Sequence, residues 1–342
     1  MLQFLKRIKR EGFLSFDLGS SYIKIAEIQQ EGDNPILTGF IRGKTFENAI
    51  INGIINNEEL LFYNIKNLLD IFKPSIKKVY LSLPYDLVIL GNFFTKDIEN
   101  LEAIKKQIDD EIPYKIEDVY YDYYTIPSGG NYEVFYIVSK KSIVDSYVKL
   151  FNHLNFEIVN IDADIVNLHN YTEFFYEEEN KLIIDWGYSK IKLFFCEKKA
   201  PVYGRELLNL GLKSFISKVA KELKISQEIA EKLIVNPTKN EKKEQVLEMY
   251  KDYIRELLKE IEYSLDLIFN KFNFRPTTIY LVGGGAAILN IENILGNFLN
   301  ISIKKLTIEN KIKISKDIDP NYLPIINTQG ALAIATAIKD FI

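Results

Sequence analysis

The feature that most constrains the fold of this chain is a strand–turn–strand pattern that occurs twice. In the first copy, residues 13–28, an apolar run ends at Asp17, a turn of Leu-Gly-Ser-Ser follows, and apolar alternation resumes at Ile23. In the second copy, residues 181–195, the same arrangement surrounds Asp185. The two aspartates lie 168 positions apart, close to half of the 342-residue chain. This spacing indicates two similar domains, because a solenoid repeats every roughly 20–50 residues.

Each hairpin carries residue types that suit a magnesium–phosphate group. A carboxylate at the end of a buried strand is costly to desolvate, so we expect it to face a cleft that holds water or a cation. The small residues after it let backbone N–H groups approach an anion closely, and Mg²⁺ is held by carboxylates together with phosphates. A plain hairpin turn is the alternative, and a single copy would favour it. Two facing copies would instead grip one phosphate chain from both sides.

A third pattern is a strand that runs into three glycines. Residues 278–282 suit a strand, and Gly283, Gly284 and Gly285 follow it before a helical pattern begins. Helix N-termini attract phosphates, and glycines allow close backbone approach, but the G-x-G-x-x-G fingerprint of dinucleotide binding is not met. A tight strand-to-helix turn explains this segment equally well. Residues 329–338 predict a helix of small residues that can pack closely on a neighbour.

Composition argues against several classes of protein. Lys and Arg total 43 against 47 Asp and Glu, so the net charge of −4 does not favour bulk nucleic-acid binding. Cys196 is the only cysteine, which excludes an intrachain disulfide and favours a reducing compartment. Two histidines argue against a histidine-rich metal site. No apolar run reaches the roughly 18 residues of a membrane span, and a chain of this length suits about two domains.

The N-terminal residues 1–10 mix apolar and basic side chains. They fit a short amphipathic helix that touches an anionic membrane surface. A solvated or loosely docked terminus is favoured for so short a segment. No apolar h-region follows the basic residues, so the segment does not indicate a secretory signal.

Between the two hairpins, the pattern predicts an inserted α/β subdomain. Helical spacing over residues 58–72 and a compact strand at 78–84 come first. From residue 87 on, the predicted elements are a strand at 87–94, a helix at 98–108, strands at 120–126 and 132–139 joined by a Ser-Gly-Gly-Asn turn, a helix at 141–154 and a strand at 156–161. The tyrosines of this region suit an interface, although aromatic strand residues that pack on a helix are the commoner case.

The second half of the chain is predicted to be rich in helices. Residues 164–175 form a helical pattern with Asp164 at the N-cap. Two short helices are predicted at 211–221 and 226–234, the second capped by Ser226. Residues 245–272 predict one long amphipathic helix.

The order of these patterns resembles the actin-like ATPase superfamily. Two D-x-G-x-S hairpins come first, a strand–Gly-Gly-Gly–helix segment follows, and a small-residue helix lies at the C-terminus. The hairpins match its two phosphate loops, and the glycines match its adenosine loop. Within the superfamily, the chain is most similar to the PilM family of type IV pilus assembly, which is related to FtsA. The resemblance covers nearly the whole chain and is carried by residues 17–24, 111–123, 158–162 and 260–266.

The resemblance implies an α/β protein with the actin-like ATPase fold. Two duplicated RNase H-like domains would surround a nucleotide cleft, with a small α/β subdomain inserted in the first. We expect the first domain at residues 1–86 and 162–180, with a C-terminal helix at 328–342 that packs back on it. The insertion would span 87–161, and the second domain 181–327, of which 213–250 form the smaller lobe.

The resemblance also implies binding of ATP with Mg²⁺. Asp17 and Asp185 would hold the metal through water, since Mg²⁺ keeps part of its hydration shell. Asp164, with Asp162 as a second candidate, would face the terminal phosphate and orient an attacking water, while a simple N-cap is an equal alternative for Asp164. The nucleotide contacts expected from the two phosphate loops, the smaller lobe and the adenosine loop are Asp17, Gly19, Ser20, Ser21, Lys24, Asp185, Gly187, Ser189, Glu231, Gly283, Gly284 and Gly285.

Two departures from the family pattern concern the nucleotide. An A-E-x-x-K run in the smaller lobe usually places its lysine near the base or ribose, but here the run ends in Ile234. Base contacts or affinity are therefore expected to differ. The second loop carries the bulky Trp186 and Tyr188, and Ser189-Lys190 stands where a threonine is common. Because of these substitutions, the contacts to the terminal phosphate are expected to differ from those of the family.

The function implied by the resemblance is that of a cytoplasmic, ATP-binding scaffold with at most slow ATP hydrolysis. It would belong to the type IV pilus assembly platform and lie peripheral to the inner membrane, with no nucleic-acid partner. The expected partner is a PilN-like bitopic membrane protein, bound through its cytoplasmic N-terminal peptide between the first lobe and the inserted one, with other platform proteins nearby. A filament-forming FtsA-like division protein and a small-molecule kinase of the same superfamily are the alternatives.

Overall fold

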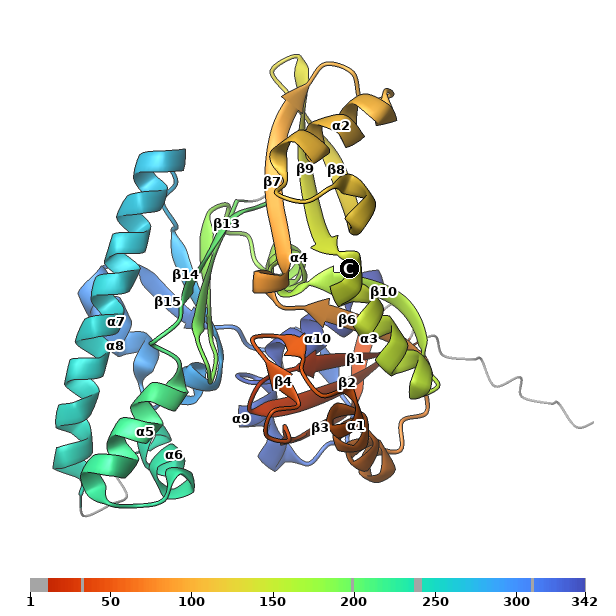
Figure 1. Cartoon of the computed structure of the whole chain (residues 1–342). Coiled ribbons are helices and arrows are strands. Elements are labelled where there is room, and N and C mark those ends of the chain that lie inside the picture. Colours follow the sequence, from red (N-terminus) through yellow and green to blue (C-terminus); the bar gives the residue numbers. More distant parts are fainter. Residues whose placement is uncertain (1–11, 32–33, 198–199, 237–241, 309–310, 342) are drawn as a thin grey trace, which may run out of the picture.

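The computed structural model describes residues 12–31, 34–197, 200–236, 242–308 and 311–341. The basic segment 1–10 lies outside these residues. Figure 1 shows two halves, each built on a mixed sheet, and a smaller sheet that projects from the first half at the top of the view. In the described part of the chain, no helix combines the length and the apolar character that crossing a bilayer requires.

The first large sheet has the strand order β10-β6-β1-β2-β3-β16. Its central hairpin of β1 and β2 is antiparallel, and β6 pairs parallel with β1 on the other side. The strands are β1 (Gly12–Leu18), β2 (Tyr22–Glu31), β3 (Asn34–Lys44), β6 (Lys78–Leu83), β10 (Glu157–Ala163) and β16 (Lys313–Ile314). A separate small hairpin is formed by β4 (Ile50–Ile51) and β5 (Ile54–Ile55).

The second large sheet, in the order β13-β12-β11-β14-β15, repeats this topology. Its strands are β11 (Lys181–Trp186), β12 (Ile191–Cys196), β13 (Pro201–Leu207), β14 (Thr278–Gly283) and β15 (Ser302–Lys305). The hairpin of β11 and β12 is again antiparallel, and β14 again pairs parallel with its first strand. The predicted duplication into two RNase H-like halves is therefore confirmed.

The two repeated hairpins match at the level of residue pairs. Asp17 at the end of β1 lies opposite Lys24 of β2. Asp185 near the end of β11 lies opposite Lys192 of β12. The strand register therefore places one acid and one lysine side by side in each half, at the same step of the repeat.

Helices cover both large sheets. The first half has α1 (Glu58–Phe72), α3 (Lys141–His153), α4 (Asp164–Phe175), α9 (Leu323–Ile326) and α10 (Ala331–Ala337). The second half has α5 (Leu212–Leu223), α6 (Gln227–Val235), α7 (Lys243–Phe272) and α8 (Ile291–Leu299). The predicted bounds of α1 are confirmed: the Asn57 side chain caps its first turn, and Leu61, Ile65 and Leu68 bury one face. The Ser226 cap of α6 is confirmed as well.

The projecting sheet has the order β7-β9-β8. It comprises β7 (Val88–Thr95), β8 (Val119–Ser128) and β9 (Asn131–Lys140), with α2 (Leu101–Glu111) packed on it. Its own core includes Phe93, Ile104 and Val134. The helix α3 and strand β10 were predicted as the end of this insertion. They instead pack with the first large sheet, because β10 pairs parallel with β6 and the aromatic side chains of α3 fill the core under β1.

The small-residue helix α10 packs directly on the first sheet. The Ser15 hydroxyl of β1 donates a hydrogen bond to the backbone carbonyl of Ala333. Ala331, Ala333 and Ala337 are fully buried. Because alanine side chains are short, the helix backbone can approach the strands, which is the packing that the sequence predicted for this segment.

Replacing Ala333 by leucine is expected to destabilise the protein by about 1–3 kcal/mol, the usual cost of overpacking a core. The control is the same change at Ala103, an exposed position of α2, which should stay within about 0.5 kcal/mol. Urea unfolding of both variants measures the free-energy difference. Equal stability of the two variants would contradict the close packing of α10 on β1.

Candidate functional site

One cavity between the two halves gathers most of the residues predicted to bind nucleotide. The predicted residues that line it are Asp17, Gly19, Ser20, Ser21, Lys24, Asp164, Asp185, Gly187, Ser189, Glu231, Gly283 and Gly284. The two phosphate loops touch across it, since the hydroxyl oxygens of Ser20 and Ser189 lie 2.6 Å apart, within hydrogen-bond distance. Residues 169 positions apart in the chain are thus brought to one point.

Three glycines, one in each phosphate loop and one at the end of β14, lie so close to other atoms of the protein that a side chain would not fit. An added Cβ atom would lie 2.7 Å from the carbonyl oxygen of Tyr22 at Gly19, and 2.8 Å from that of Lys190 at Gly187. Gly283 has a φ of +84° and would bring a Cβ within 2.8 Å of the Asp185 carboxylate. Only glycine fits these positions comfortably.

Two predicted site residues lie away from the cavity wall. Gly285 is buried, and a Cβ there would lie 2.0 Å from the ring of Trp186. Its glycine therefore makes room for the indole, whose N–H donates to the Tyr253 hydroxyl at 3.0 Å. Asp162 accepts a hydrogen bond from Lys339 and lines a different pocket, which lies beside α4.

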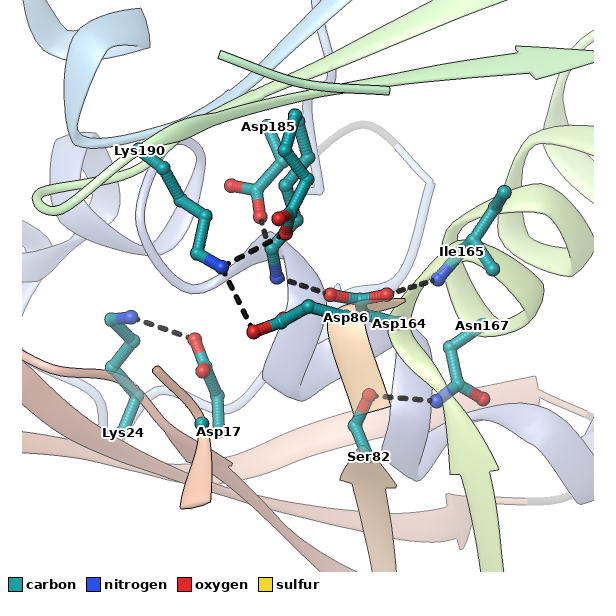
Figure 2. Close-up of polar contacts among 12 residues, drawn as sticks. Asp17, Lys24, Ser82, Asp86, Asp164, Ile165, Asn167, Asp185 and Lys190 are labelled. Atoms are coloured by element: carbon teal, nitrogen blue, oxygen red, sulfur yellow. Dashed lines mark hydrogen bonds and ion pairs between the residues drawn. The ribbon is translucent and has the colours of Figure 1, made fainter. Parts of the chain in front are cut away.

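In the first hairpin, the lysine turns back to its own acid. Lys24 Nζ lies 2.6 Å from Asp17 Oδ2, and both side chains are mostly buried. A cation that approaches Asp17 would have to share its carboxylate with this ammonium. Figure 2 shows the pair at the edge of the first sheet, below Lys190.

In the second hairpin, the corresponding lysine crosses to the other half of the molecule. Lys192 Nζ lies 2.5 Å from Asp164 Oδ2 and 4.0 Å from Asp185 Oδ2. Lys192 was not among the site residues predicted from the sequence. The repeat could have indicated it, because Lys192 follows Asp185 by the same seven positions that separate Lys24 from Asp17. The buried pair joins α4 to β12 at the wall of the cavity.

Asp164 is the first residue of α4, whose N-cap is Ala163, so the predicted N-cap assignment is wrong by one position. The Asp164 carboxylate is buried and accepts from the backbone N–H of Ile165 at 2.7 Å as well as from Lys192. Figure 2 shows the Ile165 contact. Both of its oxygens are therefore engaged, so a water bound to Asp164 would share the carboxylate with Lys192 and Ile165.

Burial is the main cause of the raised pKa values of Asp164 and Asp185. Burial raises the pKa of the Asp164 carboxyl above its ordinary value, and the charge of Lys192 partly offsets this. Burial likewise raises the pKa of Asp185, with Lys192 opposing the shift and the nearby Asp164 and Asp17 adding to it. Burial lowers the pKa of Lys192, but the two carboxylates outweigh it, so that the pKa is raised overall and the ammonium stays charged.

Lys190 forms a second connection across the cavity that the sequence did not predict. Its ammonium donates to Asp86 Oδ2 at 2.8 Å and to Glu206 Oε1 at 2.9 Å. Asp86 belongs to the short helix η1 (Tyr85–Leu87) of the first half, whereas Glu206 lies on β13 of the second. No local pattern marks Asp86, because its role depends on a partner 104 positions away.

Apolar side chains line the part of the cavity that α5 and α6 supply. Ile234, the residue that replaces the family lysine, lines the cavity together with Leu212, Ile216 and Val235. Glu231 is the acid contributed by α6. Burial raises the pKa of Tyr22, and the charge of Glu231 adds to the shift. The α6 side of the cavity thus offers one carboxylate among apolar contacts.

The sequence profile of the family described as type IV pilus assembly protein PilM matches residues 15–341. The chain belongs to the PilM family. A comparison with curated proteins found no match.

Solved structures agree with the family. A PilM–PilN type IV pilus biogenesis complex contains a chain that is 19% identical and superposes with a TM-score of 0.81, over 97% of this chain and 99% of that one. The ethanolamine utilization protein EutJ from Carboxydothermus hydrogenoformans has a TM-score of 0.56 at 13% identity, over 96% of this chain and 90% of that one. These similarities establish the actin-like ATPase fold.

A further similar structure is MreB5 of Spiroplasma citri bound to AMPPNP. It has a TM-score of 0.52 at 13% identity, over 86% of this chain and 91% of that one. In the PilM-family chain, the hairpins of the two large sheets meet at Ser20 and Ser189.

Replacing Lys192 by methionine is expected to destabilise the protein by about 3–5 kcal/mol, because the buried Asp164 carboxylate would lose its partner. The deficit should grow as pH rises: the pKa of Asp164 is already raised by burial, and an unpaired buried acid folds more readily when it is protonated. The measurement is urea unfolding of wild type and variant between acidic and neutral pH.

The matched control is the double variant Asp164→Asn, Lys192→Met, which removes the charge on both sides. It should be more stable than Lys192→Met alone and should lack the additional pH dependence. A single variant as stable as wild type at neutral pH would show that the pair does not hold the two halves together.

Proposed function

We propose that this PilM-family chain is an ATP-binding, actin-like scaffold of the type IV pilus assembly platform. The observation that carries the proposal is the match over almost the full chain to a protein solved in complex with PilN. The proposed location is the cytoplasmic face of the inner membrane, where a PilN-like membrane protein and other platform proteins would hold the scaffold. We assign the first domain to residues 12–86 and 141–180, joined by residues 313–341, because α3, β10 and β16 all belong with the first sheet. The proposed partner-binding insertion spans 87–140, and the second domain 181–305 includes a smaller lobe at 213–250.

Nucleotide binding is supported by the cavity between the halves. Backbone amides of Gly19, Ser20 and Ser21 in the first loop, and of Gly187 and Ser189 in the second, are the proposed phosphate donors. Lys24 supplies a nearby positive charge, and the turn at Gly283 and Gly284 with Glu231 would face the nucleoside. The MreB5 structure, which shares the fold, was solved with AMPPNP bound.

Magnesium fits this site only as a hydrated ion carried by phosphate. Among the described residues, no group of three or more acidic, histidine or cysteine side chains is arranged to hold a metal. Asp17 and Asp185 both line the cavity. Mg²⁺ commonly keeps several waters and takes one or two carboxylates plus phosphate oxygens. The two aspartates are therefore proposed to hold water molecules of a bound Mg²⁺.

Slow or negligible hydrolysis is part of the proposal. Asp164, the predicted catalytic acid, is occupied by Lys192 and by the N–H of Ile165. Asp162, the second candidate, is paired with Lys339 outside the cavity. Because water positioning dominates phosphoryl transfer, a site whose candidate acids are both engaged suits binding better than turnover.

Asp17→Asn and Asp185→Asn are each expected to weaken Mg-ATP binding by about 10–100-fold, the usual effect of losing a residue that orients metal-bound groups. Calorimetric titration with Mg-ATP measures this. Asp252→Asn, a change at an exposed α7 position, is the control and should match wild type. Unchanged affinity in both cavity variants would contradict the assignment.

A groove beside α4 supports the partner site. The three-stranded sheet supplies Leu90, Tyr123 and Phe135, and α4 supplies Val166 and His169. Tyr124 and Phe135 stack with ring centroids 5.2 Å apart. Burial lowers the pKa of His169 to about 3, so that its imidazole is neutral, and its Nδ1 has no hydrogen-bond partner among the described residues. Apolar and aromatic side chains beside polar ones, among them the paired Asp162 and Lys339, suit an extended peptide.

Val166→Arg is expected to reduce binding of the cytoplasmic N-terminal peptide of the PilN-like protein by at least about tenfold, because a charged side chain would fill an apolar groove. Phe174→Arg on the exposed side of the same helix is the control and should bind as wild type does. Fluorescence anisotropy with a labelled peptide measures both. Peptide binding by Val166→Arg that is as tight as that of wild type would contradict a partner site in this groove.

A further inference from the structure

Three exposed lysines lie at the end of the first sheet where β1 begins. Lys73 and Lys77 belong to the loop between α1 and β6, and Lys78 is the first residue of β6. Gly12, the first residue of β1, lies directly against this loop, since a Cβ atom added to it would be 2.5 Å from the Ile76 side chain. Figure 1 shows α1 and β10 on the side of the first half that is turned away from the second half.

A buried acid fixes the loop to the sheet. Glu27 of β2 is 6% exposed. Its carboxylate accepts from the Ser75 backbone N–H at 3.0 Å and from the Ser75 hydroxyl at 3.1 Å, and it also accepts from Gln29 and Thr38. A buried carboxylate is costly unless it is hydrogen-bonded. These contacts hold the loop at one place on the sheet, so the lysines are presented from a fixed edge.

The same edge carries an exposed apolar side chain. Ile71, in the last turn of α1, is 72% exposed, the largest value among the large hydrophobic residues that the structure describes. Lys73 ends this helix two residues later. Asp70 and Glu157 flank the lysines, and Glu27 lies beneath them. The described part of this edge is therefore apolar and mixed in charge, not strongly basic.

The residues that precede β1 supply the excess of positive charge. Residues 1–10, which lie outside the described residues, contain four Lys or Arg and no acid. They also contain four large apolar residues interleaved with the basic ones: Leu2, Phe4, Leu5 and Ile8. The rest of the chain has 39 Lys and Arg against 47 Asp and Glu. An anionic surface therefore repels the rest of the chain as a whole and attracts it at this end.

We propose that this basic–apolar edge, made of residues 1–10 with Ile71, Lys73, Lys77 and Lys78, binds the surface of a bilayer that contains anionic lipid. The ammonium and guanidinium groups would pair with lipid phosphates, while the apolar side chains enter the headgroup layer. Apolar residues interleaved with the basic ones favour lipid over nucleic acid, which charge alone would attract.

The proposed contact goes beyond the proposed function, because it needs neither nucleotide nor the PilN-like protein. It is expected to be weak and reversible by itself, since stable membrane anchoring usually takes two signals. The PilN-like membrane protein would supply the second signal. Together the two contacts would hold the scaffold at the bilayer more firmly than either alone.

The test sediments the purified full chain with lipid vesicles, in the absence of nucleotide and of any partner protein. Vesicles of phosphatidylcholine alone are compared with vesicles that also contain phosphatidylglycerol. Wild type is expected to bind only the vesicles with phosphatidylglycerol. Raised salt should release it, because salt screens the attraction between exposed charges.

Two variants separate the contributions of apolar and basic residues. The variant Phe4→Ser, Leu5→Ser keeps the charge and is expected to weaken binding to the anionic vesicles by about tenfold or more. The variant Lys73→Gln, Lys77→Gln, Lys78→Gln should weaken it by about tenfold or more as well. The matched control removes three exposed lysines from α5 of the second half and should bind as wild type does: Lys213→Gln, Lys218→Gln, Lys221→Gln. Similar thermal midpoints of all four proteins are the folding control.

Several results would overturn the inference. Wild type could bind neither kind of vesicle, or both kinds equally. The apolar variant or the loop variant could bind as tightly as wild type, or the α5 control could lose as much binding as the loop variant, which would reduce the effect to net charge. Retention of duplex DNA without retention of vesicles would indicate a nucleic-acid partner instead. Failure of the proposed function is distinct, since neither nucleotide nor the PilN-like peptide is present in this test.

Discussion

The buried ion pair of Lys192 with Asp164 constrains how the two halves meet, together with the apolar core that both halves share. Asp164 is 1% exposed and Lys192 12% exposed, and each comes from a different half. A buried charge without its partner is strongly destabilising, so orientations of the halves that separate the two groups are disfavoured. The cavity walls, including both phosphate loops, are held in register by this constraint together with the Ser20–Ser189 contact.

The duplication produces two similar hairpins whose lysines pair with different acids. In both, strand register sets an acid beside a lysine. In the first half, Lys24 stays with its own acid, whereas in the second half Lys192 leaves Asp185 for Asp164. Within the described part of the chain, Asp185 consequently accepts no hydrogen bond from a lysine, since Lys192 Nζ lies 4.0 Å away, and burial raises its pKa. A symmetric sequence pattern thus becomes an asymmetric site: both acids line the cavity, but only Asp17 is bonded to the lysine of its own hairpin.

A single helix connects the cavity to the proposed partner groove. Asp164 at the start of α4 lines the cavity, and Val166, His169 and Asn170 further along it line the groove. Asp162, just before the helix, binds Lys339 of the C-terminal turn. The rigid backbone of α4 therefore joins the cavity and the groove physically.

The sequence by itself determined the duplication, the two acidic hairpins, the glycine turn and the bounds of α1, because strand alternation, helical spacing and glycine positions are local signals. Tertiary structure alone decided the partners of Lys190 and Lys192, since they lie 104 and 28 positions away. It also decided that Gly285 accommodates Trp186 and that α3 and β10 belong to the first sheet. Side-chain partners and packing neighbours depend on how the elements meet in space, and no local pattern encodes that.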